Sequence, residues 1–127
     1  MALILIVEDE APLREAYETI LSTHGHNVET AADGEAALKL LADDKSKVPA
    51  VILLDMKLPR VTGIEFLRRL PKEVPGAMKS NVIIFSNQED EPEITEAFQL
   101  GAKKYILKAW ASPRNLVKVI DETLEKS

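Results

Sequence analysis

The sequence predicts an α/β protein in which five parallel strands form one doubly wound sheet with helices on both faces. Three uninterrupted apolar runs, at residues 2–7, 51–54 and 82–85, have the length and composition of strands buried on both sides. A stretch with helical spacing of apolar residues follows each run, and this strict alternation is typical of a parallel sheet. A length of 127 residues is common for a single domain, so we expect one domain spanning residues 1–127.

Composition excludes several classes of function. The net charge of −5, from 16 basic and 21 acidic residues, argues against direct binding to nucleic acid, which requires a basic surface. The chain has no cysteine, so disulfides, thiolate catalysis and thiolate metal sites are excluded. The apolar run at 2–7 is too short to cross a bilayer or to form the core of a signal peptide. We therefore expect a cytoplasmic protein that does not bind a membrane.

In the first half of the chain, cap and turn residues separate three strands and two helices. Pro12 suits the first turn of the first helix, where an N–H would have no partner, and Gly25 suits the end of that helix. Residues 27–31 alternate polar and apolar, which predicts a strand at an edge of the sheet. Asp33 can cap the second helix, and the polar residues 42–50 predict a loop. We expect the two helices to bury Leu13, Tyr17, Ile20, Leu21 and His24, and then Ala36, Ala37, Leu40 and Leu41.

The second half of the chain adds two strands and three helices. Thr62 can cap the third helix, and residues 71–80 contain two prolines and a glycine, which predict a surface connection. Gly101 suits the end of the fourth helix, residues 105–107 predict the fifth strand, and residues 112–113 open the last helix. The residues that we expect these helices to bury are Ile64, Leu67 and Leu70, then Ile94, Ala97 and Phe98, and then Leu116, Val119, Ile120 and Leu124.

The order of the strands follows from their composition. The three long apolar runs belong in the middle of the sheet, whereas the alternating strand at 27–31 belongs at an edge. Crossovers between parallel strands are right-handed, which leaves few topologies. The order 2-1-3-4-5, that of a flavodoxin-like (βα)5 fold, satisfies both conditions.

Polar side chains follow the carboxyl ends of four predicted strands. These residues are Glu8 and Asp9, Asp55, Ser86 and Lys108. Because the carboxyl ends of parallel strands lie at one edge of the sheet, we expect the five side chains to lie close together. Three neighbouring carboxylates repel unless a cation neutralises them, and oxygen ligands favour Mg²⁺. A carboxylate beside a cation, an amine and a hydroxyl is a candidate nucleophile for phosphoryl transfer.

Each of these residues also has a simpler explanation when it is taken alone. Asp55, or Glu8 with Asp9, could cap the helix that follows it. Ser86 could be a turn residue, and Lys108 could be a solvated surface charge. Their occurrence together at matching strand ends favours a shared site.

Motifs along nearly the whole chain are those of a known family. They are Ile-Leu-Ile-Val-Glu-Asp-Glu at 4–10, Ala-Ala-Asp-Gly-Glu-Ala-Ala-Leu at 31–38, Leu-Leu-Asp-Met-Lys-Leu-Pro at 53–59, Gly63 with Glu65-Phe66-Leu67, Phe85-Ser86, and Gly-Ala-Lys-Lys-Tyr-Ile-Leu-Lys at 101–108. With these motifs the chain resembles the receiver domain of two-component response regulators.

The resemblance implies a phosphoacceptor and a metal site. Asp55 would accept a phosphoryl group from the phosphohistidine of a histidine kinase or of a phosphotransfer protein. Asp9, Asp55 and the backbone carbonyl of Lys57 would bind Mg²⁺, and Glu8 would act through a bound water. The protein would catalyse only its own phosphorylation and dephosphorylation.

The resemblance also implies a conformational switch. Ser86 and Lys108 would bind the phosphoryl oxygens, helped by the backbone N–H groups of Met56 and Asn87. Tyr105 would turn inward when Ser86 moves toward the phosphate. The fourth helix, fifth strand and fifth helix would then bind a downstream protein. From the residues alone, the favoured explanation of Tyr105 is a strand aromatic half-packed on the last helix.

Three positions depart from the family's usual residues. Glu8 replaces an aspartate, and its longer arm is compatible with a contact through water. Ala109 replaces a proline; without proline a cis peptide would cost about 3–4 kcal/mol, so either the bond is trans or the site holds that strain. Asn87 replaces a small residue, and its bulk could narrow access to the acyl phosphate. We expect slowed hydrolysis or phosphorylation, which Asn87→Ala would relieve.

Three remaining residues have structural explanations. His24 and His26 flank Gly25 in a turn, whereas a phosphorelay histidine would lie on the face of a helix bundle. Trp110 is expected near the start of the last helix, where a half-buried ring is favoured over an anchor for a partner.

Two other functions stay open at this stage. The first is a small Mg²⁺-dependent phosphohydrolase with Asp55 as its nucleophile. Such enzymes commonly have a second acid two residues after the nucleophile, and the residue here is Lys57, which argues against it. The second is a degenerate receiver that serves only as a binding scaffold, against which the intact Asp9, Asp55, Ser86 and Lys108 argue.

Overall fold

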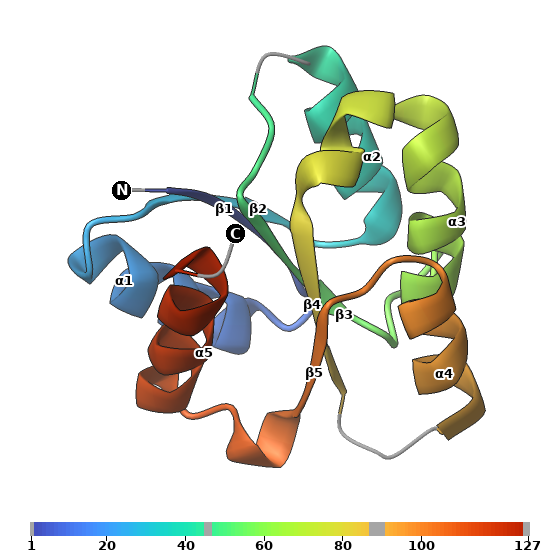
Figure 1. Ribbon diagram of the computed structural model, residues 1–127. Helices are drawn as coiled ribbons and strands as arrows, with labels where there is room; N and C mark the ends of the chain where they lie inside the picture. The colour runs from blue at the N-terminus through green and yellow to red at the C-terminus, as the bar shows by residue number, and fades with distance from the viewer. Residues whose placement is uncertain (1, 45–46, 87–90, 126–127) are drawn as a thin grey trace.

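Five parallel strands form one central sheet in the computed structural model, which describes residues 2–44, 47–86 and 91–125 (Figure 1). The strands are β1 (Leu3–Val7), β2 (Asn27–Ala31), β3 (Val51–Asp55), β4 (Asn81–Ser86) and β5 (Lys104–Leu107). Their order is β2-β1-β3-β4-β5, so the predicted fold class and strand order are confirmed. In the ladder Val7 pairs with Leu54, and Asp55 pairs with Phe85, which places the ends of β1, β3 and β4 side by side.

Helices cover both faces of the sheet. One face carries α1 (Ala11–Thr23) and α5 (Pro113–Glu125), and the other carries α2 (Gly34–Asp43), α3 (Gly63–Glu73) and α4 (Glu91–Gln99) (Figure 1). Two short 3₁₀ helices, η1 (Pro75–Lys79) and η2 (Lys108–Trp110), follow α3 and β5. None of the helices within the described ranges is long and apolar enough to cross a membrane.

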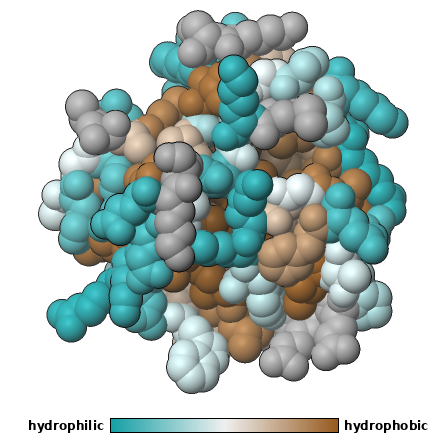
Figure 2. All heavy atoms as spheres, in the orientation of Figure 1, coloured by the Kyte–Doolittle hydropathy of each residue, from teal (hydrophilic) through white to brown (hydrophobic). Residues whose placement is uncertain are grey.

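Alternate residues of the central strands contribute to two separate cores. Ile4, Val51 and Ile83 pack with α1 and α5, whereas Leu5 and Ile52 pack with α2, α3 and α4. Because both sides of these strands are buried, their sequences are continuously apolar and not alternating. Hydrophilic side chains cover much of the surface in the view of Figure 2, with hydrophobic atoms visible between them.

Two predicted helix caps are confirmed. The Asp33 carboxylate accepts a hydrogen bond from the Ala36 N–H at 2.7 Å, and the Thr62 hydroxyl accepts one from the Glu65 N–H at 3.2 Å. Each bond satisfies a donor that has no partner within the helix. These caps fix where α2 and α3 begin, beside β2 and the β3–α3 loop.

The predicted surface connection at 71–80 is exposed at Lys72, Glu73, Pro75, Gly76 and Lys79, but it is helical and not irregular. Pro71 lies within the last turn of α3, which runs to Glu73, and η1 follows it. A proline there removes one backbone hydrogen bond, and the last turn still closes because the Val74 N–H donates to the Leu70 carbonyl at 2.8 Å. Val74 and Ala77 are buried in the core, so this connection is packed against the protein.

Several helix faces also differ from the prediction. In α2, which extends two residues into the predicted loop at 42–50, Leu38 is buried and Ala36 is exposed. The reason is that α2 packs against α3 as well as against the sheet, which widens its buried face. In α4, Ala97 is buried but Phe98 is 43% exposed.

The two helices of the other face show smaller differences. His24, after the end of α1, is exposed. In α5, Val119 and Leu124 are only partly buried, whereas Val117 and Thr123 are buried. The Thr123 hydroxyl can be buried because it donates to the Val119 carbonyl at 2.8 Å.

Candidate functional site

Three carboxylates meet at the carboxyl edge of the sheet. One side-chain oxygen of each of Glu8, Asp9 and Asp55 lies within 4.8 Å of the others. Glu8 and Asp9 directly follow β1, and Asp55 is the last residue of β3. Glu8 and Asp55 are buried, and Asp9 is exposed. A group of oxygen ligands at this spacing suits a hard divalent cation such as Mg²⁺.

The ammonium group of Lys108 lies between two of these acids. It donates a hydrogen bond to Asp55 Oδ2 at 2.9 Å and lies 2.9 Å from Glu8 Oε1. The same ammonium lies 5.3 Å from the centre of the Phe85 ring, within range of a cation–π interaction. The structure therefore brings the predicted amine to the predicted nucleophile.

Burial and charge shift the pKa of two groups at this site. Burial raises the pKa of Glu8 to about 7, further supported by Asp55 and Asp9, although Lys108 opposes the shift. Burial by itself would lower the pKa of Lys108, but its bonds to Asp55 and Glu8 outweigh burial and the pKa is raised. The crowded acids thus compete for one ammonium, which is the electrostatic situation that a bound cation relieves.

Backbone groups complete the surroundings of Asp55. The Lys57 N–H donates to Asp55 Oδ1 at 3.0 Å. The Met56 N–H, predicted to help bind a phosphoryl oxygen, donates here to the Phe85 carbonyl at 3.3 Å. Asn87, predicted to help in the same way, lies outside the described residues.

The two predicted switch residues lie on neighbouring strands. Ser86 ends β4, is buried, and pairs in the ladder with Leu107 of β5. Tyr105 is half-buried and packs against the core on the side of α2, α3 and α4. The alternative that Tyr105 packs on the last helix was therefore wrong, because successive residues of β5 face opposite sides of the sheet.

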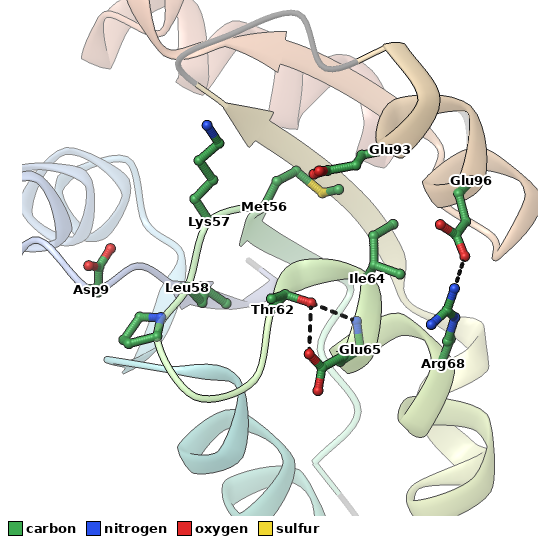
Figure 3. A pocket seen from close by; sticks show the side chains of 11 residues that line it. Asp9, Met56, Lys57, Leu58, Thr62, Ile64, Glu65, Arg68, Glu93 and Glu96 are labelled. Atoms are coloured by element: carbon green, nitrogen blue, oxygen red, sulfur yellow. Dashed lines mark hydrogen bonds and ion pairs between the residues drawn. The ribbon is translucent and has the colours of Figure 1, made fainter.

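An open pocket of about 610 Å³ lies beside the acid group and shares Asp9 with it. Lys57 and Thr62 of the β3–α3 segment line one part of this pocket, and Glu93 and Glu96 of α4 lie across from them (Figure 3). Arg68 pairs with Glu96 and joins α3 to α4 at the pocket wall. Of the three acids, Asp9 is the one that lines this pocket.

The β3–α3 loop is held closely against its neighbours. A Cβ at Gly63 would lie 2.8 Å from Met56 Cα and 2.9 Å from the Asp55 carbonyl oxygen, so only glycine fits there. Arg60 has a φ of 64°, in the left-handed region, and its guanidinium lies 3.2 Å from Asp33 Oδ2. These contacts fix the loop that carries Met56 and Lys57.

Sequence reasoning missed several residues around the site. Arg14 of α1 donates to the Glu8 carbonyl at 2.7 Å and holds the end of β1. The Glu10 N–H lies 3.3 Å from Glu8 Oε2. A basic residue one turn after a strand that ends in acids is a usable signal for Arg14.

The turn after Lys108 shows the conformation of the Lys108–Ala109 peptide bond and the exposure of Trp110. The described residues contain no cis peptide, so the Lys108–Ala109 bond is trans. Trp110 lies in η2, before α5, and is 69% exposed. The prediction of a half-buried Trp110 ring was therefore wrong, because the 3₁₀ turn directs this side chain away from the core.

The chain is similar in sequence to known proteins. The family model of the response regulator receiver domain matches residues 4–121. The chain is 34% identical to the transcriptional regulatory protein AfsQ1 of Streptomyces coelicolor, over 85% of this chain and 45% of that protein. It is also 34% identical to the phosphate regulon transcriptional regulatory protein PhoB of Pseudomonas aeruginosa, over 98% of this chain and 52% of that protein. The chain thus spans about half the length of these curated relatives.

Solved structures give the same assignment. The chemotaxis protein CheY4 of Vibrio cholerae superposes with a TM-score of 0.85 at 26% identity, covering 97% of this chain and 98% of that one. A CheY-like receiver domain protein of Methanospirillum hungatei superposes with a TM-score of 0.87 at 28% identity, covering 99% of this chain and 95% of that one. The chain therefore belongs to the response regulator receiver domain family.

Proposed function

We propose that this receiver domain accepts a phosphoryl group on Asp55 from the phosphohistidine of a histidine kinase or phosphotransfer protein. The observation that carries the proposal is the position of Asp55. Its two carboxylate oxygens accept hydrogen bonds from the Lys57 N–H and the Lys108 ammonium. Asp55 also lies in one group of carboxylates with Glu8 and Asp9. Those two hydrogen bonds hold the Asp55 carboxylate at the carboxyl edge of the sheet.

The transfer needs no reactant beyond the donor. A carboxylate oxygen of Asp55 attacks the phosphorus, and a new oxygen–phosphorus bond forms. The bond between phosphorus and the imidazole nitrogen breaks and its electron pair stays on that nitrogen. The proton that the phosphohistidine carries on its other ring nitrogen makes the released histidine neutral. The product is an aspartyl phosphate, and its hydrolysis returns Asp55 and inorganic phosphate.

The acid group fits Mg²⁺ by the chemistry of its donors. Asp9, Asp55 and the Lys57 carbonyl would hold the ion, and Glu8 would act through a bound water. When bound, the ion supplies positive charge that offsets the negative charge of the phosphoryl oxygens. Lys108 contributes a second positive charge, since its ammonium lies 2.9 Å from Asp55 Oδ2.

The response to phosphorylation involves Ser86 and Tyr105. The phosphoryl group adds negative charge and three acceptor oxygens, toward which the Ser86 hydroxyl and the Lys108 ammonium move. Tyr105 turns inward as Ser86 moves, and the face made by α4, β5 and α5 then binds a downstream protein. The domain catalyses only its own phosphorylation and dephosphorylation, acts in the cytoplasm and contacts neither nucleic acid nor membrane directly.

The experiment is incubation with acetyl phosphate and Mg²⁺, followed by intact mass measurement and Trp110 fluorescence. We expect the mass of one added phosphoryl group, and no addition to Asp55→Asn. Absence of addition to the unaltered protein would favour a binding scaffold, and turnover of a phosphate ester would favour a phosphohydrolase. The family assignment favours neither alternative.

A further inference from the structure

Tyr17 of α1 connects three parts of the chain behind the site. Its side chain is fully buried, and its hydroxyl donates a hydrogen bond to the Ala111 carbonyl at 3.0 Å. The edge of its ring meets the Phe85 ring, with centres 5.8 Å apart and planes at 74°. Phe85 lies under the Lys108 ammonium. Tyr17 thus contacts both the residue beneath Lys108 and the end of the turn that Lys108 begins.

The hydrogen bond fixes a short segment. Lys108 opens η2, and the turn closes where the Ala111 N–H donates to the Lys108 carbonyl at 3.1 Å. Beyond it, the Asn115 side chain donates to the Trp110 carbonyl at 2.8 Å. A buried hydroxyl requires a partner, and the carbonyl that Tyr17 uses belongs to the last residue of this turn. The position of the turn therefore depends on α1.

The chemistry at Asp55 requires a fixed turn. Lys108 can reach a phosphoryl oxygen on Asp55 only if its backbone holds the ammonium within hydrogen-bond range. Small displacements of such a group weaken its interaction strongly. The residue directly after Lys108 is Ala109 and not a proline with a fixed φ, so the backbone of the turn depends on its contacts.

We propose that Tyr17 is a positioning residue for Lys108, acting through its hydroxyl on Ala111 and through its ring on Phe85. This inference rests on the proposed function, in which Lys108 binds the phosphoryl group. The pKa of Tyr17 is raised by burial and then by the nearby charge of Glu8, which agrees with a hydroxyl close to the charged site.

The test compares Tyr17→Phe, which removes one oxygen atom, with the unaltered protein. Beryllofluoride with Mg²⁺ is the probe for phosphoryl binding, Mg²⁺ alone is the probe for the acid group, and acetyl phosphate gives the rate of phosphorylation. We expect beryllofluoride affinity and phosphorylation rate to fall about three- to tenfold, the effect of one lost hydrogen bond. Affinity for Mg²⁺ alone should stay within about twofold, because the lost hydrogen bond runs to the Ala111 carbonyl and not to an acid.

Thr123→Val is the matched control, since it removes another buried hydroxyl, on α5, whose bond to Val119 lies away from the site. Urea unfolding of each variant shows that the measurements are made on folded protein. Phe85→Leu, which keeps an apolar side chain but removes the ring beneath Lys108, should lower beryllofluoride affinity in the same way.

The outcomes separate the two proposals. Tyr17→Phe binding beryllofluoride as tightly as the unaltered protein would overturn the positioning role. Equal losses in Tyr17→Phe and Thr123→Val, or a parallel loss of Mg²⁺ affinity, would also overturn it, because they would indicate general loosening. If the unaltered protein itself neither reacts nor binds the probe, the proposed function fails independently of Tyr17.

Discussion

Glu8 shows how one buried side chain sets the electrostatics of the site. It lies fully buried beside Asp55 and Lys108, and its pKa is about 7 because burial disfavours its charged form. Its side chain is longer than the aspartate usual at this position of the family, and it reaches the Lys108 ammonium. The charge of the site at neutral pH therefore depends on Glu8.

The stability of the metal-free protein should fall as the pH rises. The folded protein binds the Glu8 proton more tightly than the unfolded chain, because the pKa rises from 4.5 to about 7 on folding. The free energy of unfolding then decreases as the pH rises through this interval, by up to about 3 kcal/mol. Urea unfolding with a chelator at pH 5, 6, 7 and 8 measures this. Glu8→Gln should flatten the slope, and a stability that rises over the same range would contradict the assignment.

Gly63 is the second residue with a specific requirement. A Cβ there would lie 2.8 Å from Met56 Cα, and the nearest atoms are backbone atoms that cannot move aside alone. We expect Gly63→Ala to lower the free energy of unfolding by about 1–3 kcal/mol and to weaken Mg²⁺ binding. Gly76→Ala is the matched control, because the nearest atom is Val48 Cγ2 at 3.9 Å. Equal stabilities of the two variants would contradict the close packing of the loop.

At the scale of elements, the start of α2 supports the loop that follows β3. Asp33 uses one carboxylate oxygen to cap α2 and directs the other to Arg60, which lies in the left-handed region. A Cβ at the neighbouring Gly34 would lie 2.8 Å from Val61 Cγ1, so the backbone at the start of α2 lies in close contact with the β3–α3 loop. The loop carrying Met56 and Lys57 is therefore fixed by a helix from another part of the sequence.

Two substitutions of Asp33 separate its two contacts. Asp33→Asn keeps a cap oxygen, so the free energy of unfolding should change by less than about 0.5 kcal/mol, given that the pair with the exposed Arg60 is weak. Asp33→Ala removes the cap and should cost about 1–2 kcal/mol. Chemical denaturation measures both variants. Equal losses would show that the ion pair, and not the cap, is the larger contribution.

At the scale of the whole molecule, the site joins both halves of the core. Its residues come from β1, β3, β4 and the turn after β5, and each of these strands packs helices on both faces. A ligand that binds at this edge therefore contacts residues at the ends of four of the five strands. Binding to the folded state alone stabilises a protein in proportion to the logarithm of ligand concentration.

Beryllofluoride with Mg²⁺ should therefore stabilise the entire domain. At a ligand concentration 100 times the dissociation constant, the free energy of unfolding should rise by about 2.7 kcal/mol. Thermal unfolding followed by circular dichroism measures the shift. Asp55→Asn should show no shift with the same additions, and an equal shift in this variant would place binding elsewhere on the surface.

Local patterns determined the architecture of this protein. Buried parallel strands require continuous apolar residues, so β1, β3 and β4 were visible as runs, and the alternating β2 was correctly placed at the edge. Helix caps depend on neighbouring atoms, so Asp33 and Thr62 were identified. Because parallel strands end at one edge, the meeting of Asp9, Asp55 and Lys108 followed from strand order alone.

Tertiary structure decided the contacts between distant segments. The bond of Arg14 to the Glu8 carbonyl and the bond of Tyr17 to Ala111 join residues from different elements. The helical course through Pro71 and the exposure of Trp110 likewise depend on how the helices and turns pack. Periodicity and capping act over a few residues, whereas these contacts depend on the relative placement of whole elements, which short-range patterns do not encode.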